Sequence, residues 1–359
     1  MMKALNHVPL ALRPARDPQR PLSNTRVLSA AHGVLPVEAV AALFEPGDVL
    51  VLNNASTLPA SLHGRTGGDA AVELRLLPNR EPFAKVRDVV LFGSGDWRTD
   101  TDRRPAPPSL ALGDRIHFAG GESAVVRAEH ALSERWLSVE FETDDMAEFL
   151  FEAAAPVQYA HLERPLRLSE VQTPYGGPAW AVEMPSTGRP LSFALLQAIE
   201  ARGAQVAWLT HGAGLSATGD PRIDRQLPFP ERYAIPEPTV RAIEGAERVI
   251  AVGTTVVRAL ESAAEHGPLH AGEGIATLVL GPNTPLRVVS AILTGMHSPG
   301  ESHWELLRAF ADDHVLYALH ARATRKGLLA HEFGDLLFLS RASRREGQRG
   351  SSLLLERAF

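Results

Sequence analysis

Residues 248–262 read Arg-Val-Ile-Ala-Val-Gly-Thr-Thr-Val-Val-Arg-Ala-Leu-Glu-Ser, and this stretch decides the fold class. Residues 249–253 predict a buried strand, because they are apolar and unbroken by a charge. The chain then turns at Gly-Thr-Thr and enters a helix whose Val257, Leu260 and Ala264 share one face. A strand that runs directly into a helix is typical of an α/β sheet.

The turn itself is a candidate ligand site. It leaves the first N–H groups of the helix without intrahelical partners, and it adds the hydroxyls of Thr254 and Thr255 beside Gly253. Such a turn can cradle a phosphate, a carboxylate or a polar sugar, and Arg258, one helical turn further, can close on an anion from the side. The alternative is a capped strand-to-helix connection that binds nothing, and the residues leave both interpretations open.

Length and composition limit the classes of protein to which the chain can belong. A chain of 359 residues suggests two domains, and 45% hydrophobic with 22% charged residues is typical of a globular protein in water. No apolar run reaches the ~20 residues that cross a bilayer, and residues 1–14 do not form a signal peptide. There is no cysteine, which excludes thiolate chemistry and disulfides. We therefore expect a cytoplasmic protein without membrane contact, monomeric or homodimeric. Its net charge of −6 offers nucleic acid no global attraction.

The chain divides into three stretches. Residues 1–60 and 151–340 alternate strand and helix patterns, which predicts an α/β domain that carries the active cleft. Residues 61–150 contain short alternating runs between Gly, Pro and Asp clusters, which favours a small antiparallel β-barrel. Residues 341–359 form a basic C-terminal tail, with four arginines between 341 and 349. In the α/β part we expect helices at 37–44, 192–202 and 238–245 and from 302 and 313, and strands at 49–52, 205–209, 249–253, 288–293 and 336–339.

Three loops that follow strands bring polar groups to one edge of the predicted sheet. They carry His211, the pair Thr254 and Thr255, and His297. Ligands of open α/β sheets bind at the carboxyl ends of the strands. If these strands are neighbours, two imidazoles and two hydroxyls line one cleft, and a neutral imidazole can accept a proton near pH 7. The alternative for each histidine is a hydrogen-bonded loop residue.

Other motifs are absent, and no metal is expected. The pairs His297 with His303 and His314 with His320 lack the i, i+4 spacing that places two ligands on one helical face. Dinucleotide, P-loop and Gly-x-Ser-x-Gly fingerprints are missing as well.

Four blocks occur in the order found in the S-adenosylmethionine:tRNA ribosyltransferase-isomerase family of queuosine biosynthesis, which the chain resembles over nearly its whole length. The blocks are residues 47–55 (Gly-Asp-Val-Leu-Val-Leu-Asn-Asn-Ala), 253–262, 294–299 (Thr-Gly-Met-His-Ser-Pro) and 333–339 (Phe-Gly-Asp-Leu-Leu-Phe-Leu). The resemblance implies a discontinuous Rossmann-like α/β domain with a small antiparallel β-barrel inserted near residues 61–150.

The resemblance also implies a transferase and isomerase reaction with S-adenosylmethionine as ribosyl donor. The sulfonium acidifies the C5′ hydrogens, so a base can remove one and start the loss of adenine. The aminomethyl group of a 7-deazaguanine base in tRNA then bonds to the ribosyl fragment, and ring closure expels methionine. This chemistry asks for a base near C5′, a donor at the leaving adenine and an anchor for the methionine carboxylate.

The roles that this reaction requires are assigned to eight residues of this chain. The base is His297 or His211, and Glu231 is carried over as a catalytic residue from a family cluster. Gly253, Thr254 and Thr255 would hold ribose or carboxylate oxygens. Arg258 is the expected partner of a carboxylate, and Arg189 is expected to contact the acceptor or the donor carboxylate.

Departures from the family pattern mark a divergent member. The family's Pro-Thr-Ala-Gly-Leu-His-Phe block reads Pro-Ser-Thr-Gly-Arg-Pro-Leu at 185–191, so Pro190 replaces a histidine and Arg189 is new. Of the family's His-x-Met-His-x-Glu cluster only Glu231 is kept, and its Asn-Asp-Thr-Arg block reads Asn-Asn-Ala-Ser at 53–56. Two alternatives therefore stand beside tRNA modification: a paralogue that uses S-adenosylmethionine on a small-molecule acceptor, and a non-catalytic binding protein.

Overall fold

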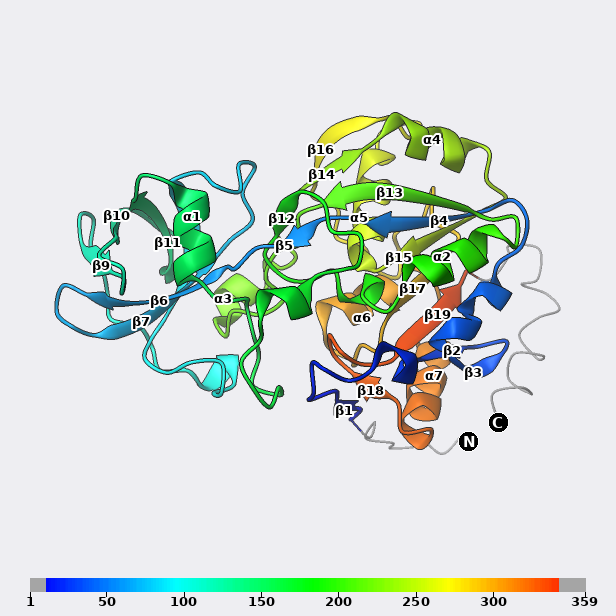
Figure 1. The fold of residues 1–359 in the computed structure, drawn as a ribbon, viewed down its shortest axis with the longest axis horizontal. Coiled ribbons are helices and arrows are strands. Elements are labelled where there is room, and N and C mark those ends of the chain that lie inside the picture. Colours follow the sequence, from blue (N-terminus) through cyan, green and yellow to red (C-terminus); the bar gives the residue numbers. More distant parts are fainter. Residues whose placement is uncertain (1–10, 342–359) are drawn as a thin grey trace.

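The computed structural model describes residues 11–341 and shows two bodies, a large α/β body and a β-barrel beside it (Figure 1). The α/β body is built on a nine-stranded sheet in the order β16-β14-β13-β4-β15-β17-β19-β2-β3. Its strands are β2 Arg26–Ser29, β3 Gly33–Pro36, β4 Asp48–Asn53, β13 Gln205–His211, β14 Glu231–Ile235, β15 Arg248–Val252, β16 Gly272–Ala276, β17 Ala291–Gly295 and β19 Leu336–Ser340.

The four central strands, β13, β4, β15 and β17, run parallel to one another, and both flanks are mixed or antiparallel. Every residue of β4 is buried. Its Val49 and Val51 join the core on one face of the sheet, whereas Leu50 and Leu52 join the core on the other face. The unbroken apolar run is explained by this alternation, because a central parallel strand is covered on both sides.

Helices cover both faces of the sheet. Helices α4 to α7 contribute to the core that contains Val49 and Val51, and α2 contributes to the core that contains Leu50 and Leu52. The helices are α1 Met146–Ala153, α2 Phe193–Glu200, α3 Pro221–Asp224, α4 Glu237–Glu244, α5 Thr254–Ala263, α6 Ser302–Leu307 and α7 Asp313–Arg325. Short 3₁₀ helices span Leu22–Asn24, Val37–Leu43, Thr101–Arg103, Leu168–Val171 and Ser186–Gly188.

A closed six-stranded antiparallel barrel forms the second body, in the order β10-β11-β8-β7-β6-β9. Its strands are β6 Ser61–Thr66, β7 Ala71–Leu76, β8 Val86–Phe92, β9 Arg115–His117, β10 Ser123–His130 and β11 Ser133–Glu142. Helix α1 follows, and its Met146, Phe149 and Leu150 enter the barrel core. The barrel strands all lie between β4 and β13 in sequence, so an α/β domain interrupted by a barrel is confirmed.

Two short parallel pairs lie outside the sheet and the barrel. Strand β5 (Ser56–Thr57), on the way to the barrel, pairs with β12 (Ala179–Ala181), on the way back. Strand β1 (Arg13–Pro14) pairs with β18 (Leu329–Ala330) near the carboxyl end. The first pair ties the outgoing and returning connections together at the junction of the two bodies (Figure 1).

Most element boundaries differ from the expectation by one or two residues, and three differences are informative. The strand expected at 288–293 begins at Ala291, because the carboxylate of Glu261 accepts the N–H groups of residues 287–289 and holds them in a loop. Strand β13 extends through Thr210 and His211, which pair with β14. The helix at 37–44 is a 3₁₀ helix over 37–43. The expected basic tail, apart from Arg341, lies outside the described residues. Over residues 11–341 no helix has the length and apolarity that a membrane crossing needs.

Candidate active site

The carboxyl ends of β13, β4, β15 and β17 meet at one edge of the sheet, because these strands are parallel. His211 ends β13, the Gly253 turn follows β15, and His297 follows β17. Strands β15 and β17 are neighbours, but β4 separates β13 from β15. The three predicted loops therefore share an edge, with His211 set apart from the other two by one strand.

Gly253 makes the turn from β15 into α5 with φ +85°, a left-handed conformation that favours glycine. A Cβ atom at this position would lie 3.6 Å from Oγ1 of Thr187 and 3.7 Å from Oγ1 of Thr255. Thr254 is buried and Thr255 is half-buried. The turn thus presents two hydroxyls around a glycine at the carboxyl end of β15. One of them, from Thr187, was not among the predicted residues.

Arg258 is buried one turn into α5 and makes an ion pair with Glu231. Its guanidinium also donates to the carbonyls of residues 229, 276 and 278, so each of its nitrogens has a partner. Glu231 accepts the Gly214 N–H at 2.6 Å and lies 3.4 Å from Nε2 of His211. His211, Glu231 and Arg258 form what we call the closed cluster, in which the predicted anion partner holds a carboxylate of its own chain.

Burial dominates the charge states of the closed cluster. Burial raises the pKa of Glu231. It lowers the pKa of His211 to about 3, with help from the charge of Arg258. Both ring nitrogens of His211 are buried and have no hydrogen-bond partner. His211 is thus neutral near pH 7 and has no exposed surface.

His297 has a more accessible environment. Its side chain is 18% exposed, with Nε2 at 3.1 Å from Oγ1 of Thr294 and Nδ1 at 3.7 Å from a carboxylate oxygen of Glu301. Its ring stacks on His303 with centroids 4.7 Å apart, and burial lowers the pKa of His303 to about 3. The imidazole of His297 is therefore oriented from two sides and remains reachable.

A small hollow is lined by residues that were not among the predicted site residues. Among them Glu183 accepts hydrogen bonds from the hydroxyl of Tyr159 and from the N–H of Ser216. Burial raises the pKa of Glu183 to about 7. Glu332 and Phe333 line this hollow and a second one. Phe333 begins the motif block 333–339, but no motif marks the other residues, which come from separate connections.

Arg189 lines the second hollow together with His331 and Glu332. Its guanidinium donates to the carbonyls of Glu170 at 3.2 Å and Pro18 at 2.7 Å, and it lies 4.7 Å from the ring centre of Phe333. Arg189 is thus held in place beside a hollow. Its role toward a ligand remains a prediction.

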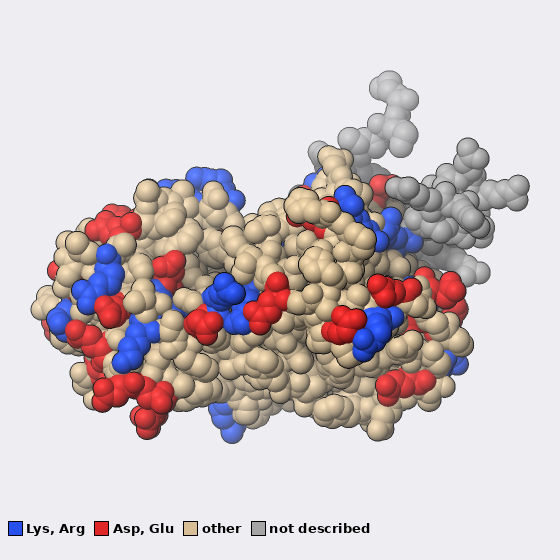
Figure 2. All heavy atoms as spheres, turned by 90° about the horizontal axis from the view of Figure 1, so that it is seen from above, with Lys and Arg blue, Asp and Glu red and all other residues tan. Residues whose placement is uncertain are grey.

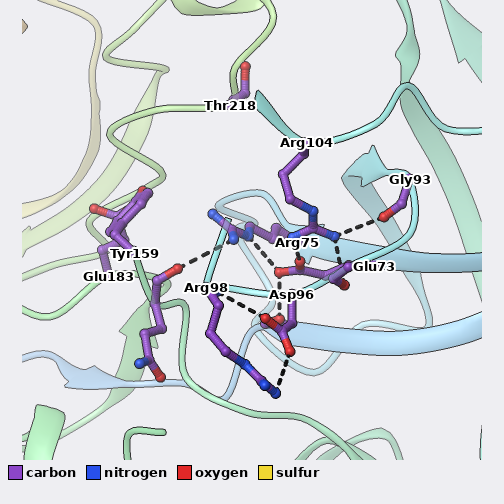
Figure 3. Close-up of polar contacts among 12 residues, drawn as sticks. Glu73, Arg75, Gly93, Asp96, Arg98, Arg104, Tyr159, Glu183 and Thr218 are labelled. Carbon is purple, nitrogen blue, oxygen red and sulfur yellow. Dashed lines mark hydrogen bonds and ion pairs between the residues drawn. The ribbon is translucent and has the colours of Figure 1, made fainter. Parts of the chain in front are cut away.

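A buried ionic cluster of Glu73, Arg75 and Arg104 in the barrel contacts Tyr159, which lines the first hollow. Arg75 Nε lies 2.7 Å and Arg104 Nη1 2.5 Å from the carboxylate of Glu73. Burial alone would raise the pKa of Glu73, but the two guanidinium groups hold it at about 2. Figure 3 shows Arg75 between Glu73 and the pair of Tyr159 and Glu183, and its guanidinium lies 5.5 Å from the Tyr159 ring centre. The ionic cluster therefore links the barrel to the residues that line the first hollow.

Charges on the face seen in Figure 2 are mixed. Basic and acidic side chains alternate over the barrel and over the α/β body, and among the described residues of this face no broad basic stripe is visible.

Comparison with known proteins gives a consistent result over the whole chain. The model of the family described as "Queuosine biosynthesis protein" matches residues 9–339. A relative named S-adenosylmethionine:tRNA ribosyltransferase-isomerase from Citrifermentans bemidjiense is 32% identical, covering 92% of this chain and 96% of its own length. A relative of the same name from Geobacter sulfurreducens is 30% identical, covering 90% and 95%. The crystal structure of an S-adenosylmethionine tRNA ribosyltransferase from Thermotoga maritima matches with 21% identity and a TM-score of 0.47, covering 92% of this chain and 98% of that one.

Proposed function

The chain belongs to the queuosine biosynthesis protein family, and from this premise we propose that it is an S-adenosylmethionine-dependent ribosyltransferase and isomerase acting on tRNA. The ribosyl group would pass to the aminomethyl group of a 7-deazaguanine base, with release of adenine and methionine. The observation that carries the proposal is the family match over residues 9–339, which includes the Gly253 turn at the carboxyl edge of the sheet. In α/β sheets this edge is where ligands bind.

The proposed base is His297. Proton removal from C5′ needs a neutral imidazole within reach of the substrate. His297 is partly exposed and oriented by Thr294 and Glu301, whereas His211 is fully buried beside Glu231. His211 is the second candidate, and Glu231 would act through it, because its carboxylate lies 3.4 Å from the ring.

Donor binding is assigned to the Gly253 turn and to the second hollow. Gly253, Thr254 and Thr255 would contact ribose or carboxylate oxygens through backbone N–H groups and hydroxyls. Arg258 would support this turn indirectly, through its ion pair with Glu231. Arg189, beside the second hollow, is the proposed partner of the methionine carboxylate.

Glu183 is the proposed acid at the leaving adenine. A carboxyl group whose pKa is raised to about 7 by burial keeps a proton near neutral pH and can donate it. Tyr159 and Ser216 fix its orientation in the wall of the first hollow. We expect Glu183→Gln to lower the rate of adenine release and to remove a titration near pH 7 from the pH profile of that rate.

A small-molecule acceptor is the second candidate function. It is favoured by the mixed charge of the face in Figure 2, by the net charge of −6 and by Pro190 in place of the family histidine. The donor chemistry would then be kept while the acceptor differs. A steep fall of tRNA affinity with salt would favour the tRNA substrate over this alternative.

The test is incubation with S-adenosylmethionine, with and without tRNA that carries the aminomethyl-deazaguanine, followed by mass spectrometry of adenine and methionine. Release of both only with that tRNA supports the proposed function. Release without it points to a small-molecule acceptor, and no release under any condition points to a non-catalytic binding protein.

Variants then locate the base. We expect His297→Ala to lower the rate of adenine release by about 10²–10⁴-fold, the usual contribution of a general base. His314→Ala, at an exposed histidine, is the matched control and should leave the rate unchanged. An unchanged rate in His297→Ala would remove His297 from the mechanism.

A further inference from the structure

Three potential metal ligands from distant parts of the sequence meet beside the second hollow. His161 lies in the connection that returns from the barrel, and His331 and Glu332 lie between β18 and β19. One ligand atom of each lies within 4.8 Å of the other two. We propose that His161, His331 and Glu332 form a binding site for one divalent first-row transition-metal ion, for which zinc is the probe.

The donor set fits such an ion. Two imidazoles and one carboxylate are found as the protein ligands of catalytic zinc and of ferrous iron sites that keep a position open for substrate or water. Two ligand atoms at about 2.1 Å from a tetrahedral zinc ion lie about 3.4 Å apart. His161 Nε2 and Glu332 Oε2 are already 2.8 Å apart, so only a side-chain adjustment separates this arrangement from a coordination sphere.

The three side chains are held in place before any ion binds. The rings of His161 and His331 stack with centroids 4.4 Å apart. His331 has φ +66°, which is uncommon for a residue other than glycine and costs about 1–3 kcal/mol. The turn at 331 thus keeps two adjacent ligands against His161.

An ion at this position would also be accessible. The side chain of His161 is 13% exposed and that of Glu332 29%, and Glu332 lines both hollows. The open position of the ion would therefore be reached from the two hollows that Glu332 lines. Alternatively, His161 and Glu332 form an ion pair that binds no metal, and the ring of His331 stacks on His161. Metal titration distinguishes this arrangement from a metal site.

The test uses the full chain, stripped with a chelator and measured without S-adenosylmethionine or tRNA. Zn²⁺ is titrated by calorimetry, and Co²⁺ by its visible absorption, which reports nitrogen and oxygen coordination. We expect one equivalent of each to bind. His161→Ala and Glu332→Gln should raise the Kd by more than the about 10–100-fold that loss of an outer-sphere partner costs.

The controls separate this site from other histidines and from misfolding. His266→Ala, at an exposed histidine elsewhere, should leave the Kd unchanged. Glu332→Gln keeps the side-chain shape, and its unfolding curve without metal checks that the chain still folds. The proposal is overturned by the absence of stoichiometric binding, by binding that survives the His161 and Glu332 variants, or by equal loss in His266→Ala. Because no substrate is present, failure here is distinct from failure of the proposed reaction.

Discussion

Two polar clusters near the carboxyl edge of the sheet differ in what their charges do. In the closed cluster of His211, Glu231 and Arg258 every member is at least 95% buried, and each nitrogen of the arginine is bonded within the chain. The open cluster, which we define as His161, His297, His331 and Glu332, is partly exposed, and its His331 and Glu332 line the second hollow. The charges of Arg258 and Glu231 are satisfied within the chain, whereas the groups of the open cluster remain partly exposed to solvent.

The difference has a physical origin. A buried charge costs several kcal/mol in lost hydration unless partners replace the water, and in the closed cluster Arg258 and Glu231 replace it for each other. A half-exposed group keeps water as its partner and can exchange it for substrate or metal at little cost. Arg258, which the sequence predicted to bind an anion, is therefore expected to stabilise the protein. The members of the open cluster keep groups that can contact a ligand.

The largest expected effect comes from opening the closed cluster. Arg258→Met should lower the free energy of unfolding by about 3–5 kcal/mol, because it leaves the buried carboxylate of Glu231 without its partner. Urea denaturation measures this loss. Arg241→Met, which breaks an exposed pair with Glu237, is the control and should cost less than about 1 kcal/mol. Equal losses in the two variants would mean that the closed cluster is not structural.

A pH dependence should follow from His211. Its pKa is lowered to about 3 in the folded chain from an unfolded value near 6.5, so its contribution to stability is present above pH 6.5 and is lost as the pH falls toward 3. Between pH 6.5 and 5 we expect the free energy of unfolding to fall by about 2 kcal/mol from this group. His211→Gln should flatten that part of the profile. An unchanged slope in the variant would contradict neutral burial of the ring.

The glycine turn begins the helix that carries Arg258, and it should respond in stability and in binding. Gly253→Ala forces a side chain into φ +85° and should cost about 1–2 kcal/mol. A Cβ atom there would also occupy the space between the hydroxyls of Thr187 and Thr255, so S-adenosylmethionine affinity should fall. Calorimetric titration and thermal unfolding measure the two effects. Gly245→Ala, where a Cβ atom meets nothing closer than 3.8 Å, is the matched control.

The smallest effect on stability is expected in the open cluster. His297→Ala should change the free energy of unfolding by less than about 0.5 kcal/mol, because its side chain is partly solvated. The same variant should lose most of its adenine release. If His297→Ala instead unfolds as readily as Arg258→Met, the division into closed and open clusters is wrong.

Local pattern was sufficient for the elements and for the domain order. The apolar run at 49–52, the Gly-Thr-Thr turn and the alternating runs between 61 and 142 each carry their signal within a few residues. The start of β17 at Ala291 was missed, because it depends on the carboxylate of Glu261, about 30 residues earlier in the chain. Such a side-chain bond leaves no periodic trace.

The amino-acid sequence alone determined the interrupted α/β fold, the inserted barrel and the family, because periodicity, turn residues and ordered motif blocks are local properties. Only the folded chain decided which polar residues are available. It paired Arg258 with Glu231 and assembled His161, His331, Glu332 and Glu183 beside two hollows. Burial and proximity between residues up to 171 positions apart depend on how the two bodies pack, and a linear pattern carries no record of that packing.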